Sequence, residues 1–325
     1  MDRRQILFAA VALSALPRVA FAQAGARVAR IGWVTAQRPA SLVPYVQAFR
    51  AALAERGFAE GSNLTMSFRY GDDDLSKVPA LTEELVRLPV DLIVVQGEAV
   101  LELRGMNLPV PVVYAYSGDP VAAGLASSLA RPNATMTGLT FLATELNGKR
   151  LELLSELTPG ARRVAILANP QYPGESGERA NAEAAAGRIG LDVHYYAART
   201  PEELAAAFTR MTADRMQGIS LFADSFTVQN RVGIIGFALR QRLPLVTSWP
   251  VFADSGALCT YGPRLVDSYQ RLAYYADRVL RGTRPADLPI EQPATIETIV
   301  NLKTAAALGL KVPQSVLVRA DRVIG

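Results

Sequence analysis

Short polar segments follow several apolar, strand-like runs in this chain, and they hold the residues best suited to binding a small molecule. The segment Ser117-Gly118-Asp119-Pro120 directly follows a β-branched and aromatic run at 110–116. In an open α/β sheet, ligands bind at the carboxyl ends of the strands, so a hydroxyl, a glycine and a carboxylate at this point predict a ligand contact. The alternative is that Asp119 only caps a helix, which the periodicity of the following residues predicts.

Comparable residues follow five other predicted strands. Hydroxyl, amide and backbone N–H groups suit a carboxylate, Asp119 or Asp224 suits an ammonium, and Trp33 with three other aromatic residues would wall an apolar part. The candidate ligand-binding residues are Thr35, Gln37, Gln96, Gly97, Ser117 and Asp119 in the first half of the chain, and Asn169, Tyr172, Asp224, Phe226 and Trp249 in the second. For any one of them taken singly, a capping or core role is the alternative.

The residues that catalysis or metal binding would need are scarce. The single histidine, His194, lies within a predicted strand, and no G-x-S-x-G elbow is present to pair with it. The single cysteine, Cys259, lies in an apolar run and cannot form an internal disulfide. The chain has no P-loop, no G-x-G-x-x-G after a strand and no Cys/His cluster. We therefore expect a binding protein with no catalytic residues, metal or cofactor.

The amino terminus has the features of an export signal. Arg3 and Arg4 precede an apolar stretch at 6–16 that is too short to span a bilayer, and Ala20-Phe21-Ala22 supplies small residues for a peptidase. We expect a signal peptide over residues 1–22, cleaved after Ala22, and a periplasmic product; an uncleaved membrane anchor is the alternative. Sec and twin-arginine export both remain open. No cysteine lies near the cleavage point, so we expect no lipid anchor.

Composition and charge point to a globular protein that does not bind nucleic acid. The 325 residues have room for two domains, half of them are hydrophobic, and a fifth are charged. The formal net charge is +4, half of it within residues 1–22, and no block of Lys and Arg is interleaved with aromatic residues. Predicted strands and helices alternate along the chain, which is typical of doubly wound parallel sheets.

This alternation restarts near residue 163, so we predict two similar α/β lobes. Segments beyond residue 257 are surplus to one lobe, which indicates that the chain crosses between the lobes more than once and forms a hinge beside a ligand-enclosing cleft. The expected lobes comprise residues 28–138 plus 262–296, and residues 139–261 plus 297–325. Residues 228–240 are predicted to form one helix and the apolar tail at 312–324 to be extended.

Several motifs occur in the order typical of one known family. They include R-I-G-W-V-T at 30–35, L-V-R-L-P-V-D-L-I-V-V at 85–95, S-G-D-P-V at 117–121, Y-G-P at 261–263, D-L-P-I-E-Q-P at 287–293 and the run from N-L-K-T-A-A-A to R-V-I at 301–324. On these motifs the chain resembles the ABC transporter substrate-binding protein family over nearly all residues after the signal. Two segments depart from the family's pattern, at 132–136 and at 169–173.

The resemblance implies a type I periplasmic-binding-protein fold, in which two lobes joined by three crossovers close on a small solute. It implies delivery of that solute to a membrane permease driven by a cytoplasmic ATPase. Some relatives bind tryptophan or tyrosine, so we expect a small polar, amino-acid-like ligand, and an aromatic one is among the options. Two other functions remain open: a sensory subunit for a membrane receptor, and a two-lobed α/β enzyme. We expect a monomer.

Overall fold

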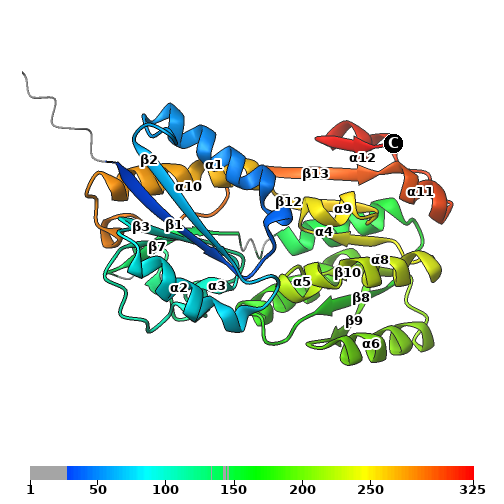
Figure 1. Ribbon diagram of the computed structural model, residues 1–325. Helices are drawn as coiled ribbons and strands as arrows, with labels where there is room; N and C mark the ends of the chain where they lie inside the picture. Colours follow the sequence, from blue (N-terminus) through cyan, green and yellow to red (C-terminus); the bar gives the residue numbers. More distant parts are fainter. Residues whose placement is uncertain (1–27, 133, 142–143, 145) are drawn as a thin grey trace, which may run out of the picture.

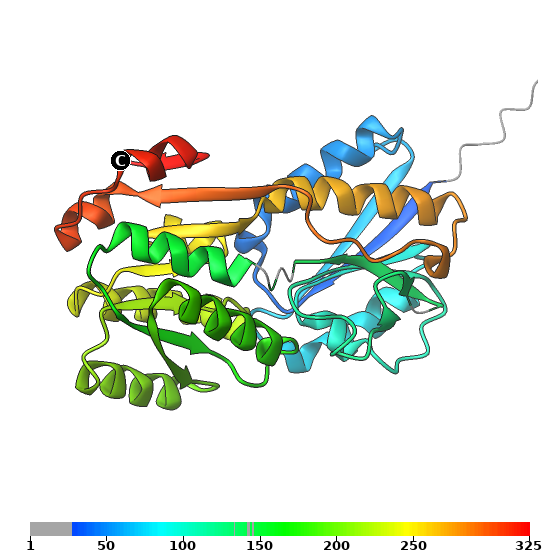
Figure 2. The ribbon, with the colours of Figure 1, turned by 180° about the vertical axis from the view of Figure 1, so that it is seen from behind.

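The computed structural model of the protein describes residues 28–132, 134–141, 144 and 146–325. The predicted signal peptide lies outside these residues. Among the described residues, no helix combines the length and apolarity that a bilayer crossing requires. Figures 1 and 2 show two α/β lobes side by side, with several segments running between them.

The first lobe is built on a sheet of five parallel strands. Their order across the sheet is β2-β1-β3-β4-β7, and they span Leu64–Tyr70 (β2), Ala29–Thr35 (β1), Leu92–Gln96 (β3), Val112–Tyr116 (β4) and Met136–Thr140 (β7). β3, β4 and β7 are buried along their whole length, as expected for parallel strands covered on both faces. β2 is an edge strand of this sheet.

Helices cover both faces of this sheet. One face packs against α1 (Val43–Glu55) and α10 (Leu265–Leu280), and the other against α2 (Val78–Arg87) and α3 (Ala99–Glu102). Trp33 of β1 is fully buried on the first face, where its ring lies 5.1 Å from Phe49 and 6.1 Å from Tyr269 between centroids. The expectation that Trp33 walls the ligand cleft is therefore wrong, because its position on β1 directs it into the lobe core.

The second lobe contains a seven-stranded sheet. Its order is β14-β13-β12-β11-β10-β8-β9, with strands Arg322–Ile324 (β14), Ile296–Asn301 (β13), Cys259–Pro263 (β12), Leu245–Thr247 (β11), Gly218–Leu221 (β10), Arg163–Ala168 (β8) and Asp192–Ala197 (β9). All neighbouring strands are parallel except β12 and β13. Cys259 is buried in the core of this lobe, and His194 lies on the edge strand β9, 2.9 Å from an Asp192 carboxylate oxygen.

Eight helices of the described chain belong to this lobe. Four of them contribute to one core cluster: Leu146–Leu157 (α4), Glu175–Ile189 (α5), Leu302–Leu308 (α11) and Gln314–Arg319 (α12). Three contribute to a second core cluster: Pro201–Ala213 (α6), Arg231–Arg240 (α8) and Pro250–Asp254 (α9). The short helix Ser225–Gln229 (α7) packs beside the second cluster. Residues 228–240 are thus divided between α7 and α8 and do not form the single predicted helix.

The chain crosses between the lobes three times, which confirms the predicted fold class. The first crossing comes after β7, which ends at Thr140, and the second after β12, which ends at Pro263. The third comes before β13, which begins at Ile296. The expected boundaries were 138, 261 and 296. Between the last two crossings, α10 returns to the first lobe, as Figure 2 shows. A hinge made of three segments permits the lobes to move as units.

Two local predictions are wrong. The residues after Pro120 form turns and a short hairpin of Ala126–Ser128 (β5) with Arg131–Pro132 (β6), because Gly124 adopts a φ of 69° and breaks a helix. The tail at 312–324 is not extended throughout, since it contains α12 before β14. Val312 and Val316, four residues apart, both reach the core of the second lobe, and this is helical spacing.

Candidate ligand-binding site

A cavity of about 350 Å³ lies between the two lobes, at the carboxyl ends of strands from both sheets. This position is the one at which doubly wound sheets bind ligands, and the volume falls in the range of small-molecule sites. The first lobe contributes residues that follow β1, β3 and β4 and residues of α1 and α10. The second lobe contributes residues around α7, α8 and α9.

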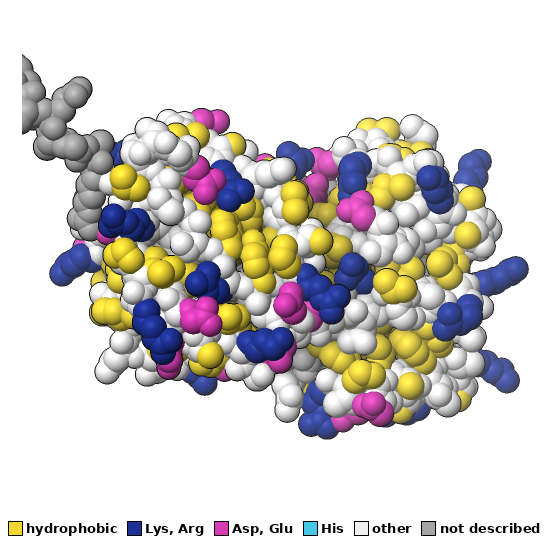
Figure 3. Space-filling view, viewed as in Figure 1, with side chains coloured by type: hydrophobic (Ala, Val, Ile, Leu, Met, Phe, Trp, Pro, Cys, Tyr) yellow, Lys and Arg dark blue, Asp and Glu magenta, His cyan; other side chains and the backbone are white. Residues whose placement is uncertain are grey.

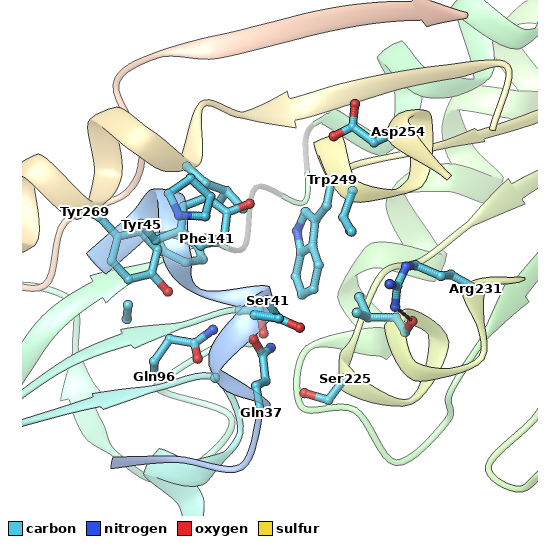
Figure 4. Close-up of a pocket in the computed structure, with 18 residues that line it drawn as sticks. Gln37, Ser41, Tyr45, Gln96, Phe141, Ser225, Arg231, Trp249, Asp254 and Tyr269 are labelled. Atoms are coloured by element: carbon cyan, nitrogen blue, oxygen red, sulfur yellow. Dashed lines mark hydrogen bonds between the residues drawn. The ribbon is translucent and has the colours of Figure 1, made fainter. Parts of the chain in front are cut away.

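Four aromatic side chains wall the cavity. Tyr45 of α1 and Tyr269 of α10 are stacked, with ring centroids 5.0 Å apart and planes inclined by 17°. Phe141 lies beside Tyr269 at 6.1 Å between centroids, and Trp249 stands across the cavity from all three, on the second lobe (Figure 4). Aromatic faces on opposite walls suit a flat apolar group of a ligand.

The polar side of the cavity in the first lobe is fixed by hydrogen bonds between neighbouring strands. The register of β1 with β3 places Thr35 opposite Gln96, and the Thr35 hydroxyl donates to Gln96 Oε1 at 2.8 Å. The Thr35 hydroxyl oxygen also accepts from the backbone N–H of Gln37 at 3.1 Å. Thr35 is fully buried, so it supports Gln96 and Gln37, and these two line the cavity with Gly97, Ser41 and Ser117.

The aromatic hydroxyls near this polar side remain neutral at ordinary pH. Burial, with the nearby carboxylates of Glu297 and Asp254, raises the pKa of Tyr45 to about 12. Burial also raises the pKa of Tyr269 well above its ordinary value, against the opposing effect of its hydrogen bond with Gln96. Both groups therefore offer a ligand an O–H donor and a weak acceptor.

Two ionisable side chains line the second-lobe side. Arg231, the first residue of α8, donates from Nε to the Ser255 hydroxyl at 3.1 Å and from Nη1 to the Val228 carbonyl at 2.8 Å. Asp254, the last residue of α9, forms an ion pair with Arg322 at 2.7 Å. Ser225 adds a hydroxyl at the start of α7.

Two predicted residues of the second lobe, Asn169 and Asp224, support this side of the cavity without lining it. Asp224 is 2 % exposed and caps α7, because its carboxylate accepts from the Thr227 backbone N–H at 2.8 Å. The Asn169 amide donates to the other Asp224 oxygen at 2.7 Å. Burial raises the pKa of Asp224, and these hydrogen bonds oppose the shift. Neither residue lines the cavity; together they hold the turn that presents Ser225.

Three further predicted residues also lie off the cavity surface. Asp119 accepts from the backbone N–H groups of Val121 at 2.7 Å and Ala122 at 3.2 Å, so its carboxylate is engaged in the turn that replaces the predicted helix. Tyr172 is buried beside Ser117, and Phe226 packs against the core of the second lobe. Of the predicted set, the structure brings Gln37, Gln96, Gly97, Ser117 and Trp249 to the cavity.

Sequence reasoning missed several of the lining residues. Tyr45, Tyr269 and Arg231 lie on helices, where periodicity alone assigns them to a core or to solvent. Phe141 lies at the first crossing between the lobes. Ser41 precedes α1 in the β1–α1 loop, and its place at a strand-to-helix junction is the one signal that pointed toward the site.

The lobes touch beside the cavity. The Ser225 backbone N–H, from the second lobe, donates to Glu98 Oε1, from the first, at 3.3 Å. The Asp119 backbone N–H donates to the Pro173 carbonyl at 3.1 Å. Burial and the neighbouring Asp224 carboxylate raise the pKa of Glu98 to about 7. The lobes are thus in contact here, with a carboxyl group of one held against the other, and we refer to this as the closed arrangement.

On the face seen in Figure 3, Lys and Arg are interspersed with Asp and Glu, and hydrophobic side chains gather toward the middle. Within the described residues, no group of three or more His, Cys, Asp or Glu side chains is arranged to hold a metal ion.

Two lobes joined by three crossings, with a cavity between them, define the class of type I periplasmic-binding-protein folds. The chain belongs to the family of ABC transporter substrate binding proteins, which matches residues 36–324. The resemblance found in the sequence is thereby confirmed.

The chain is also similar to individual proteins. The tyrosine-binding protein of Clostridioides difficile (strain R20291) is 24% identical over 280 residues, covering 81% of this chain and 76% of that protein. An ABC domain from Streptococcus pneumonia, solved in complex with L-Trp, has a TM-score of 0.83 and 26% identity, covering 91% of this chain and 99% of that chain. A conserved domain protein from Vibrio cholerae has a TM-score of 0.82 and 21% identity, covering 91% and 100% of the two chains.

Proposed function

We propose that this protein is the extracytoplasmic substrate-binding component of an ABC importer and that it encloses a small amino-acid-like solute with an aromatic group. The observation that carries the proposal is the cavity between the lobes, with aromatic side chains on opposite walls and amide and hydroxyl groups between them. The names of two relatives, one tyrosine-binding and one solved with L-Trp, support an aromatic amino acid as the first candidate.

In this proposal the aromatic part of the solute lies between Trp249 of the second lobe and Tyr45 and Tyr269 of the first. Gln37, Gln96, Gly97, Ser41, Ser117 and Ser225 supply hydrogen bonds to its polar end. Thr35, Asn169 and Asp224 act indirectly, because they hold the groups that face the solute. Binding in a closed cavity stabilises the closed arrangement, since only that arrangement offers both walls at once.

The closed arrangement is the signal that a membrane permease, driven by its ATPase, would recognise before taking the solute. A predicted signal peptide at residues 1–22, with no cysteine near its cleavage point, supports a periplasmic protein without a lipid anchor. We propose that it works as a monomer and binds its solute without chemical turnover, as membership of a substrate-binding family supports.

Native mass spectrometry of the protein as purified, followed by titration calorimetry with L-tyrosine and L-tryptophan, tests the proposal. We expect a retained solute or a saturable one-site titration, and a rise in melting temperature with solute concentration. Trp249→Ala should weaken binding, whereas Val318→Ala, at an exposed position on α12 away from the cavity, should not. If no small solute binds and none raises the melting temperature, the transport proposal is wrong.

A further inference from the structure

Arg231 is a cation that faces the cavity without a carboxylate partner among the described residues. Its two hydrogen-bond acceptors, the Ser255 hydroxyl and the Val228 carbonyl, are neutral. The guanidinium has five N–H donors in all, and these two bonds use Nε and one hydrogen of Nη1. Donors therefore remain for a group inside the cavity, and no carboxylate of the described residues pairs with the positive charge.

The position of Arg231 makes this charge costly unless an anion meets it. Arg231 is the first residue of α8, at the helix end where the macrodipole is positive. Arg240, at the other end of the same helix, has the charge that the dipole favours and lies on the exposed surface. A partly buried arginine at the unfavourable end, aimed at a cavity, is the arrangement expected of an anion-binding residue.

The carboxylate on the cavity lining does not offset this charge. Asp254 already pairs with Arg322 at 2.7 Å, and its side chain is half exposed. In Figure 4 Asp254 and Arg231 lie apart. Glu98 and Asp224 lie next to the cavity but do not line it, and both are engaged, with the Ser225 N–H and with Thr227 and Asn169. The lining thus offers a solute one unpaired cation and no unpaired anion.

From this imbalance we infer that Arg231 binds the carboxylate of the solute, and that the site accepts aromatic carboxylates whether or not they carry an α-amino group. The inference rests on the proposed function and narrows its solute class. The guanidinium fork matches a carboxylate, and a solute whose aromatic part lies against Trp249 directs its carboxylate toward α8. An α-amino group would find on the lining neutral acceptors and the Asp254 carboxylate, which Arg322 already pairs, so its removal should cost little.

Titration calorimetry with three ligands that share one ring tests this inference. The probes are L-tyrosine, 3-(4-hydroxyphenyl)propionate, which lacks the amino group, and tyramine, which lacks the carboxylate; L-tryptophan, indole-3-propionate and tryptamine form a parallel set. We expect the amino acid and the propionate to bind within about 10-fold of each other and the amine to bind at least about 10-fold more weakly, the scale of one charge-assisted hydrogen bond.

Variants then assign the effect to Arg231. Arg231→Gln should weaken the binding of both carboxylates by about 10-fold or more and leave that of the amine unchanged, and Arg231→Lys, which keeps the charge but not the fork, should fall between. Arg240→Gln, on the same helix, should match the wild type. If Arg231→Gln does not fold, Arg231→Lys and the wild-type ligand series still decide the question.

The outcomes separate this inference from the proposed function. Amines that bind as tightly as the carboxylates, or carboxylate binding that Arg231→Gln leaves intact, would overturn the role of Arg231 while the protein remains a solute-binding protein. A propionate that binds far more weakly than its amino acid would show that the amino group is recognised and would overturn the solute class. If none of the six ligands bound, both the proposed aromatic solute and the inference would be wrong.

Discussion

Closure of the lobes should be coupled to proton uptake by Glu98. In the closed arrangement Glu98, from the first lobe, lies against the Ser225 N–H and near the Asp224 carboxylate of the second. Burial and Asp224 together raise the pKa of Glu98 to about 7 from its ordinary 4.5. The other titratable groups that act with it, Tyr116 and Tyr172, are uncharged at these pH values because burial raises their pKa values as well.

The sign of the effect follows from the direction of the shift. Opening the lobes separates Glu98 from Asp224 and exposes it to water, so its pKa there should be close to ordinary. The closed state then binds more protons than the open state between about pH 4.5 and 7, and closure becomes less favourable as the pH rises through this window. Below about pH 4.5 Glu98 is protonated in both the open and the closed state, so closure there has its most favourable free energy.

The expected size is a rise in solute Kd of at most about 10-fold per pH unit, or roughly one to two orders of magnitude across the window. Titration calorimetry from pH 5 to 8 in buffers of different ionisation enthalpy measures the Kd and the protons taken up. An amino acid does not change its own charge between pH 5 and 7, so the protons belong to the protein. The reasoning is refuted if the wild-type Kd is flat over this range and no protons are taken up.

Glu98→Gln keeps an acceptor for the Ser225 N–H but cannot ionise. It should flatten most of the pH profile and bind the solute more tightly than the wild type above pH 7. Glu102→Gln, at an exposed position on α3 a turn away, is the matched control and should keep the wild-type profile.

Three other predictions concern solute contact, packing and a turn. Solute should change the intrinsic fluorescence through Trp249, so Trp249→Phe should abolish the signal, because Trp33 is fully buried in the lobe core. Gly262→Ala should lower the melting temperature sharply, since a Cβ there would lie 2.1 Å from the Ser248 carbonyl oxygen. Gly187→Ala is the contrasting variant: a Cβ at this position in α5 meets open space, so the substitution should stabilise the protein by about 1 kcal/mol. Asp119→Ala should lower stability by about 1 kcal/mol in denaturant unfolding, because it removes hydrogen bonds within a turn, and leave solute affinity within about 3-fold; a large affinity loss would return Asp119 to the site.

Much of the fold could be predicted from local patterns. Buried parallel strands appear in the sequence as nearly continuous apolar runs, as at Val112–Tyr116 and Arg163–Ala168, and amphipathic helices separate them. Segments in which the local pattern was ambiguous were predicted less well. The apolar residues of the tail fit a strand or a helix equally, and only the core of the second lobe, which receives Val312 and Val316, selects α12.

The candidate site was predictable to the extent that it depends on chain direction. Parallel strands end at one edge of their sheet, so residues after β1, β3, β4 and β11 had to collect at that edge, and Gln37, Gln96, Ser117 and Trp249 do line the cavity. The same reasoning could not separate residues that face the cavity from those that hold the turns behind it, such as Asp224.

The sequence by itself determined the class of protein, because hydrophobic periodicity, the alternation of strands and helices, and family motifs can all be read directly along the chain. The tertiary structure alone decided which side chains form the cavity. Tyr45, Tyr269 and Arg231 come from helices that meet only after three crossings have set the lobes face to face. The charge of the cavity and the raised pKa of Glu98 arise in the same way, because burial and neighbouring charges depend on contacts between residues far apart in the chain.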